Sequence, residues 1–319
     1  MITSCRNTDD FEEEINTLPK SKLISQNYNL YNWMSQIPNN AFVTQLSIPG
    51  THHSGAMHEW KKLFITVKGS AKTQNLTIKE QLVYGVRYLD MKANHDMKIY
   101  HGSVDQKLQL KDVLSDIETF LRVFPTETVI LCLKPENTNK YNEFDANFKK
   151  LYLQYEKMFA KSPRLPATLG SVRGKVILMK RFNSTIYDDG INAVNWGDNK
   201  TFDFLIGYSP NVVYVQDFYN PPTYTPTEAT DDKKKQVELM ISKSTTGSNP
   251  NSLFINYLNI SMKATGVLPL IGDRDIINTK NIMNPWMVQK SKSMVRRNLG
   301  IVAFDYITET ESRAIINTN

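Results

Sequence analysis

The sequence has few of the features that mark several large classes of protein. It contains two cysteines, Cys5 in a polar segment and Cys132 in an apolar run, so a structural disulfide is not expected and zinc bound by thiolates is excluded. Its uncharged apolar runs are far shorter than the roughly 20 residues that span a bilayer. No polybasic arm, zinc-finger pattern or basic zipper occurs, which disfavours nucleic acid as a partner.

What the chain does contain is the composition of a globular protein with a large core. Of its 319 residues, 40% are hydrophobic and 22% are charged, which fits one large α/β or α+β domain. The net charge of +6 suits an anionic partner, such as an acidic membrane or a phosphate-bearing small molecule. Residues 1–29 form a polar extension that includes the acidic block Asp9–Glu14, and residues 30–319 are expected to form the domain. The start lacks the apolar core of a signal peptide, so the compartment is not indicated.

Eight short runs rich in Val, Ile, Leu and aromatic residues alternate with segments such as residues 110–124, which have helical periodicity. The runs are residues 42–50, 86–92, 97–102, 128–135, 175–182, 212–219, 252–260 and 300–307. Eight strands in this length predict a single-domain α/β fold, a (β/α)₈ TIM barrel. The link between the second and third runs, residues 93–96, is too short for a parallel crossover. The barrel is therefore irregular there, or one of the two runs is misread. Residues 220–235 are interpreted as a surface loop leading into a helix.

Ionisable side chains stand at or just beyond the end of seven of these runs. They are His52, Asp90 with Lys92, His101, Lys134, Arg181, Asp217 and Asp305. In such a barrel the carboxyl ends of the strands gather at one face and supply the active site. The sequence therefore predicts one polar site at that face.

His52 in "IPGTH" and His101 in "IYHG" both follow an apolar run. Two imidazoles that face one cleft suit phosphodiester cleavage, one as base on the attacking oxygen and one as acid on the leaving oxygen. The alternative is a pair of turn histidines bonded to local backbone. Asp305, in an apolar run, needs a partner and could orient a histidine ring; the alternative is a structural salt bridge.

The remaining polar residues fit a phosphorylated polyol. Lys92, Lys134 and Arg181 would bring positive charge to a phosphate, and Asp217 with Tyr219 could bind hydroxyl groups. Taken singly, each cation could equally be a solvated or ion-paired strand end.

The motifs "NWMSQIPNN…LSIPGTHHSGA", "GVRYLDMKA…IYHG", "PTETVILCLK", "RGKVILMKRF", "VQDFY" and "FDYI" together resemble bacterial-type phosphatidylinositol-specific phospholipase C, the single-domain relatives of the X region. The resemblance implies a distorted TIM barrel that releases diacylglycerol and inositol 1,2-cyclic phosphate, with slow hydrolysis of the cycle to follow. It implies that His52 is the general base oriented by Asp305, that His101 is the general acid, and that Asp90 lies near the phosphate. It assigns the inositol ring to Lys134, Arg181, Asp217 and Tyr219, the last by stacking.

Two positions depart from the family pattern. His53 replaces an aspartate that supports the general-acid histidine. Lys92 replaces an arginine, so the bidentate contact of a guanidinium with phosphate oxygens is lost. Both changes predict a slower enzyme. A lysine at position 92 would also oppose a bound dication, so no metal and no other cofactor is expected. The open alternatives are an inositol-lipid-binding barrel without turnover and a metal-dependent glycerophosphodiesterase-like enzyme.

Residues 58–69 interleave apolar and lysine side chains, which suits either an interfacial helix or a core helix with snorkelling lysines. In the first case Trp60, Leu63 and Phe64 would contact the membrane. The expected partner is phosphatidylinositol at a membrane surface, bound peripherally by a monomer.

Overall fold

The computed structural model describes residues 29–62, 65–67, 71–161, 165, 167–186, 190–206, 210–222, 225–247, 249–261 and 279–319. Residues 1–28, which make up nearly all of the polar extension, lie outside this set. None of the helices in the described part of the chain has both the length and the apolar character to cross a membrane.

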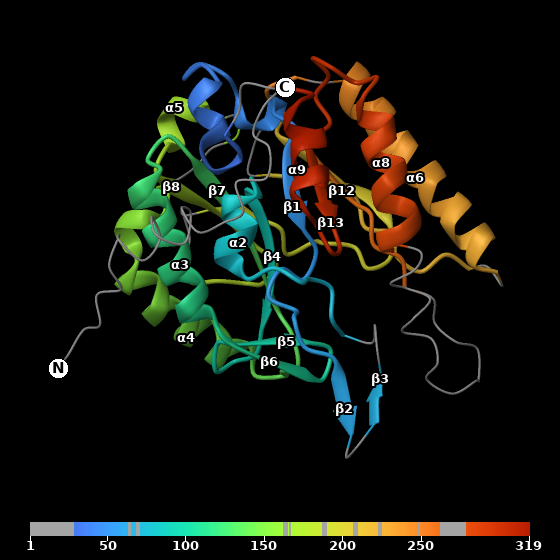
Figure 1. Ribbon diagram of the computed structural model, residues 1–319. Coiled ribbons are helices and arrows are strands. Elements are labelled where there is room, and N and C mark those ends of the chain that lie inside the picture. The colour runs from blue at the N-terminus through green and yellow to red at the C-terminus, as the bar shows by residue number, and fades with distance from the viewer. Residues whose placement is uncertain are drawn as a thin grey trace.

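The core of the fold is a curled sheet whose strands are mostly parallel, with helices on its outer side (Figure 1). The hydrogen-bonded order is β10-β11-β12-β13-β1-β4-β7-β8-β9, and only the β10–β11 pair in it is antiparallel. Among the described strands no pairing joins β9 to β10, so the barrel is incomplete there. The strands are β1 (Ile48–Thr51), β4 (Tyr88–Ala93), β7 (Thr128–Pro135), β8 (Lys175–Lys180), β9 (Ile191–Asn192), β10 (Thr201–Leu205), β11 (Val212–Gln216), β12 (Ser252–Tyr257) and β13 (Ile301–Phe304). The predicted distorted TIM barrel is confirmed.

The third predicted run is not a barrel strand. It forms β5 (Lys98–His101), which pairs antiparallel with β4 through Ala93 and Ile99 and continues into β6 (Val104–Gln109). The short link between the second and third runs is therefore a hairpin turn, in which the Met97 N–H donates to the Asn94 carbonyl. His101 reaches the site from this side hairpin rather than from the barrel wall.

Helices cover the outer face of the sheet because each has one apolar side. In α3 the residues Val113, Leu114, Ile117 and Leu121 recur at helical spacing and are buried. The helical segments are η1 (Leu30–Gln36), η2 (Val43–Gln45), α2 (Ile78–Val83), α3 (Leu110–Val123), α4 (Tyr141–Gln154), η3 (Glu156–Met158), α5 (Leu169–Val172), α6 (Pro226–Thr246), η4 (Thr279–Met283), α8 (Asn284–Ser291) and α9 (Glu309–Ile316). The helix predicted over residues 110–124 is confirmed, whereas the charged half of residues 220–235 belongs to α6 and not to a loop.

A buried ion pair closes the amino-terminal end of the barrel. Arg87 and Glu127 precede β4 and β7, are fully buried, and are joined by two hydrogen bonds of 2.8 and 2.9 Å to one carboxylate oxygen. Arg87 also donates to the backbone carbonyl of Tyr31 in η1. The segment that precedes β1 is thereby attached to the barrel floor, opposite the polar ends of the strands.

The predicted interfacial helix over residues 58–69 is wrong. Its described part forms β2 (Trp60–Lys62) and β3 (Ile65–Val67), which pair antiparallel with Trp60 opposite Val67. This hairpin extends beyond the body of the barrel, at the end opposite the C-terminus (Figure 1). Leu63 and Phe64 lie outside the described residues.

Candidate active site

Alternation along the strands places the polar residues inside the barrel. In β4, Leu89 and Met91 pack outward against the helices, while Tyr88, Asp90 and Lys92 point inward. The register pairs Lys92 with Lys134 of β7, so the two cations stand side by side. Polarity therefore rises along the interior from Tyr88 to the carboxyl ends of the strands.

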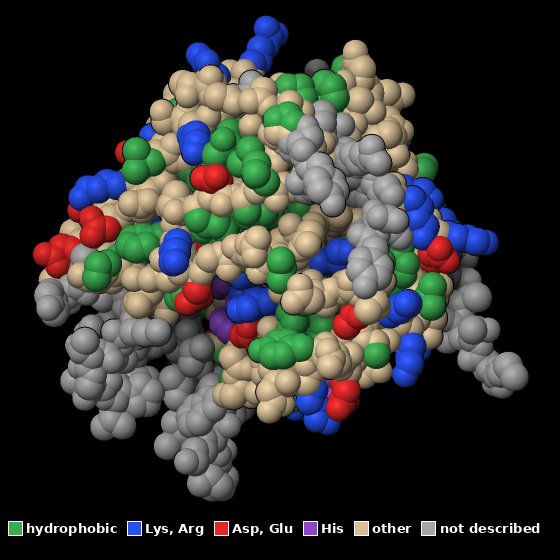
Figure 2. Space-filling view, turned by 180° about the vertical axis from the view of Figure 1, so that it is seen from behind, with side chains coloured by type: hydrophobic (Ala, Val, Ile, Leu, Met, Phe, Trp, Pro, Cys, Tyr) green, Lys and Arg blue, Asp and Glu red, His purple; other side chains and the backbone are tan. Residues whose placement is uncertain are grey.

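A pocket of ≈ 290 Å³ opens at these ends and collects nearly all of the predicted residues. Histidine, basic and acidic side chains gather in a depression of the molecular surface (Figure 2). The predicted residues in its wall are His52, His53, Lys92, His101, Lys134, Arg181, Asp217, Tyr219 and Asp305. The structure thus brings these residues together around one pocket, whereas Asp90 lies buried beside the wall.

His52 follows β1 and is held by a carboxylate from the neighbouring strand. Its Nδ1 lies 2.8 Å from Oδ1 of Asp305, just beyond β13. The backbone agrees with this pairing, since the His52 N–H donates to the carbonyl of Phe304. A carboxylate on Nδ1 fixes the proton there and leaves Nε2 free to accept one.

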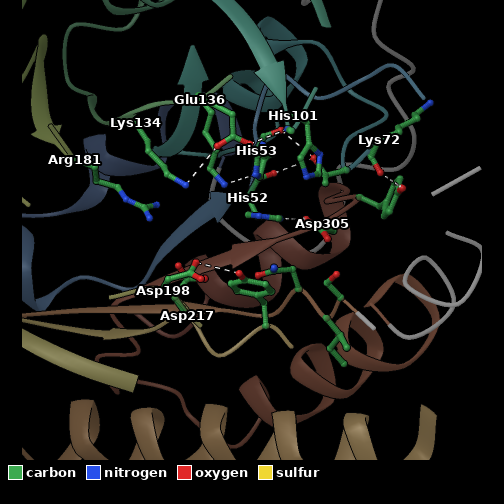
Figure 3. Close-up of a pocket in the computed structure, with 18 residues that line it drawn as sticks. His52, His53, Lys72, His101, Lys134, Glu136, Arg181, Asp198, Asp217 and Asp305 are labelled. Carbon is green, nitrogen blue, oxygen red and sulfur yellow. Dashed lines mark hydrogen bonds and ion pairs between the residues drawn. The ribbon is translucent and has the colours of Figure 1, made fainter. Parts of the chain in front are cut away.

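His101 converges on the same pocket from the β5–β6 hairpin (Figure 3). Its ring centre lies 6.2 Å from that of His52, with the two rings nearly perpendicular. Nδ1 lies 2.6 Å from the carbonyl of Ala71, so it carries the proton and Nε2 is left for chemistry. Burial, together with the charge of Lys92, lowers the pKa of His101 to about 4.

His53 lies between these histidines. Its ring stacks on His101 with centres 3.7 Å apart, and its Nε2 contacts Nζ of Lys92. Its backbone adopts a positive φ of 40° in the turn after β1, and its N–H donates to Asp90. Burial, with the nearby charges of His101 and Lys92, lowers the pKa of His53 well below its usual value, so the ring is neutral at neutral pH.

Asp90 anchors the two cations on either side of it. Its carboxylate lies 3.6 Å from Nζ of Lys92 and 3.9 Å from a terminal nitrogen of Arg181. Burial alone would raise the pKa of Asp90, but these cations outweigh it and hold the pKa below its usual value. Burial lowers the pKa of Lys92, which Asp90 partly offsets.

The opposite wall of the pocket combines a cation, aromatic rings and carboxylates. The Arg181 guanidinium lies 4.1 Å from the centre of the Trp196 ring, whose Nε1–H donates to Asp217 over 2.9 Å. The Tyr219 hydroxyl donates to Asp198 over 3.0 Å, and burial followed by this bond raises the pKa of Tyr219 to about 12. Carboxylates that already hold one donor keep free lone pairs for a ligand.

Several pocket residues were not found from the sequence. Glu136 lies 3.4 Å from Nζ of Lys134 and accepts the backbone N–H of Gly102, so it ties β7 to the residue after His101. Its spacing of two residues from Lys134 on one strand face was a usable signal. Asp198 lies in a loop with no strand pattern and gave none.

Across the described residues, no group of three or more His, Cys, Asp or Glu side chains is arranged to hold a metal ion. The cation nearest the carboxylate of Asp90 is the Lys92 ammonium. Among the predicted membrane contacts, only the backbone of Trp60 is described, as the first residue of β2.

Comparison with known proteins relates the chain to one family of phospholipases. Residues 46–182 match the family "Phosphatidylinositol-specific phospholipase C, X domain". The 1-phosphatidylinositol phosphodiesterase of Staphylococcus aureus (strain Newman) is 26% identical over 290 residues, which cover 86% of this chain and 88% of that protein. The Listeria monocytogenes protein of the same name is 29% identical over 304 residues, covering 94% and 88%.

Solved structures give the same result for the fold. The phosphatidylinositol-specific phospholipase C from Listeria monocytogenes superposes with a TM-score of 0.71 at 26% identity, covering 92% of this chain and 99% of that one. A Staphylococcus aureus phospholipase C of the same specificity, solved in work on its membrane binding, gives 0.76 at 26%, covering 91% and 98%. The resemblance drawn from the motifs is thereby confirmed: in sequence and in fold, this chain is similar over most of its length to the bacterial-type phosphatidylinositol-specific phospholipases C of the X-domain family.

Proposed function

We propose that this protein is a phosphatidylinositol diacylglycerol-lyase that needs no metal ion. The single observation that carries the proposal is the convergence of His52 and His101 on one pocket, each with its Nδ1 already engaged. Both rings then offer Nε2, which is the arrangement that paired acid–base catalysis of phosphodiester cleavage requires.

In the proposed reaction the inositol 2-hydroxyl attacks the adjacent phosphorus and its proton passes to Nε2 of His52. Asp305 stabilises the resulting imidazolium. The bond from phosphorus to the diacylglycerol oxygen breaks, and Nε2 of His101 supplies the proton to that oxygen. The products are diacylglycerol and inositol 1,2-cyclic phosphate, and the roles of the histidines reverse if water later opens the cycle.

The charges around the pocket suit this substrate. Lys92 stands beside His101 and His53, where it can stabilise negative charge that develops on the phosphate. Lys134, Arg181, Asp217 and Tyr219 form the inositol side of the proposed site. A bound phosphodiester anion would favour the protonated form of His101, which offsets the lowering of its pKa in the free protein.

The size of the pocket indicates which part of the lipid enters it. A volume of ≈ 290 Å³ accommodates a polar head group, so the acyl chains would stay in the membrane. We propose that residues 30–319 act as a peripheral monomeric barrel, with Trp60, Leu63 and Phe64 at the lipid surface. Light scattering and binding to vesicles with and without phosphatidylinositol test these two points.

Phosphorus NMR of phosphatidylinositol vesicles incubated with protein and excess chelator tests the function. The expected result is the resonance of a five-membered cyclic phosphate, lost in the His52→Ala and His101→Ala variants. Equal product from either variant and from the wild type would refute the two-histidine mechanism. Activity abolished by the chelator would favour a metal-dependent phosphodiesterase instead.

A second candidate function is inositol-lipid binding without turnover. The observation behind it is that His53 and Lys92 replace the aspartate and arginine of the family pattern at the centre of the site. Binding of vesicles with no release of diacylglycerol over long incubation would support this candidate.

A further inference from the structure

The two departures from the family pattern touch each other. Nε2 of His53 contacts Nζ of Lys92, and both side chains are almost fully buried. An ammonium group has only donors, so the imidazole nitrogen that it meets must be an acceptor. His53 therefore carries its proton on Nδ1 and takes one hydrogen bond from Lys92.

The Lys92 ammonium therefore has two neighbouring partners. His53 contacts its ammonium, and a carboxylate oxygen of Asp90 lies 3.6 Å from the same nitrogen. Further charges from neighbouring strands surround the ammonium, since Glu136, Lys134 and Arg181 all act on it. The point charge is thereby fixed at the pocket wall, although a lysine lacks the planar fork of arginine.

The same imidazole also supports the proposed catalytic acid. The rings of His53 and His101 stack with an interplanar angle of 26°, while the rings of His53 and His52 are nearly perpendicular with their centres 4.5 Å apart. A flat neutral ring fills the space beside His101 and restricts its rotation. In the family pattern described above, a carboxylate stands at this position instead.

We propose that His53 is a positioning residue that works as one unit with Lys92, so that the two departures compensate for each other rather than add as separate losses. His53 accepts the Lys92 ammonium and fixes it beside the phosphate, and its ring face supports His101. A guanidinium at position 92 is larger than an ammonium and would meet the buried His53 ring, whereas the smaller aspartate at position 53 leaves room for it. This inference rests on the proposed function.

A double-mutant cycle on phosphatidylinositol cleavage tests the coupling. The variants are His53→Asp, Lys92→Arg and the two combined, with Lys98→Arg on the exposed part of β5 as a control for the lysine-to-arginine change. Lys92→Arg should lower the rate at least about tenfold when His53 is present, and by much less, or not at all, when Asp is at position 53. Effects of the single changes that multiply to within about twofold would overturn the proposal.

Conservative variants at position 53 separate a positioning role from simple folding damage. The substitution His53→Gln keeps a hydrogen-bond acceptor for Lys92 but removes the ring. The substitution His53→Ala removes both the acceptor and the ring. With equal melting temperatures, the activity should order as wild type, then Gln, then Ala. A Gln variant no more active than the Ala variant would contradict the proposed hydrogen bond to Lys92.

Nitrogen NMR of the histidine rings in lipid-free protein tests the pair independently of any activity. Near neutral pH, His53 should show a protonated Nδ1 and an unprotonated Nε2 whose shift changes in Lys92→Met, while His52 keeps its pattern. A His53 ring protonated at Nε2 would refute this pairing. If the wild type released no cyclic phosphate but gave the expected spectrum, the function would fail and the His53–Lys92 contact would stand.

Discussion

Asp305 and His52 form a fixed pair at the centre of the pocket, with Oδ1 of the carboxylate 2.8 Å from Nδ1 of the ring. The backbone carbonyl of Asp305 accepts a hydrogen bond from Nδ2 of Asn284, which anchors the segment that carries the carboxylate. Both side chains retain slight exposure, at 10% for Asp305 and 12% for His52, so the pair is reachable by a ligand yet well shielded from water. The arrangement orients one imidazole and supplies a charge that stabilises its protonated form.

We expect Asp305→Asn to lower the turnover of phosphatidylinositol by roughly 10²–10⁴-fold, because the amide removes the charge that stabilises the imidazolium. The initial rate of water-soluble inositol phosphate release measures the effect. Asp203→Asn, on the exposed strand β10, is the matched control and should retain wild-type activity. Turnover within twofold of the wild type in the Asp305 variant would remove this carboxylate from the mechanism.

The barrel floor should carry a large share of the stability. Glu127→Ala leaves Arg87 charged and unpaired in a fully buried position, so we expect a loss of about 3–5 kcal/mol in the free energy of unfolding. Denaturant titration measures it. Glu143→Ala breaks the exposed pair with Lys140 and should cost less than about 1 kcal/mol. Similar losses in the two variants would show that the floor pair contributes no more than a surface pair.

The sequence predicted the interior of the barrel well, because the alternation of side chains along a single strand shows which of them face inward. Alternation in β4 assigns Asp90 and Lys92 to the same face as Tyr88, and a polar end on an apolar strand identifies the open end of the barrel. His52 and Asp305 followed from the same reasoning, although they lie far apart along the chain, whereas His101 reaches the pocket from the β5–β6 hairpin and not from the barrel strand that the sequence predicted. The charged start of α6 was missed, although the sequence carries its signal, since Thr225 and Glu228 form a capping box with Pro226 between them.

The parts that sequence reasoning missed depend on contacts between distant segments. The turn before β5 places Met97 at a positive φ, and methionine carries no turn signal, so the hairpin was not evident. The stacking of Trp196 on Arg181 joins a loop to the end of β8, which periodicity cannot show. Residues 58–69 fit a helical pattern, yet the described part pairs as two short strands, because propensity over so short a segment is decided by its surroundings.

Acid should destabilise the folded protein through its buried histidines. Above pH 6.5 His101 is neutral in both states; between that value and about 4 the unfolded chain binds a proton that the folded chain does not. Stability therefore falls as the pH is lowered through this window, by at most about 1.4 kcal/mol per pH unit for each such histidine. Urea unfolding at about pH 7 and about pH 5 measures the change, which His101→Asn should reduce. An unchanged slope in that variant would mean that folding does not lower the pKa of His101.

Replacing Arg181 by lysine should lower activity even though the positive charge is kept. Its guanidinium lies over the Trp196 ring with Cζ 4.1 Å from the ring centre, and within the described structure its buried Nε has no hydrogen-bond partner. A lysine would keep the charge near Asp90 but lose the planar contact and the fork that meets two oxygens at once. If Arg181 binds the head group as proposed, Arg181→Lys should lower kcat/KM at least about tenfold, with a rise in KM, because the lost contact would serve substrate binding as well as the reaction. Arg122→Lys on the exposed side of α3 is the control for the same substitution. A variant with unchanged KM and lowered kcat would show that the guanidinium acts in the transition state alone, and one with both unchanged would remove it from the inositol side of the pocket.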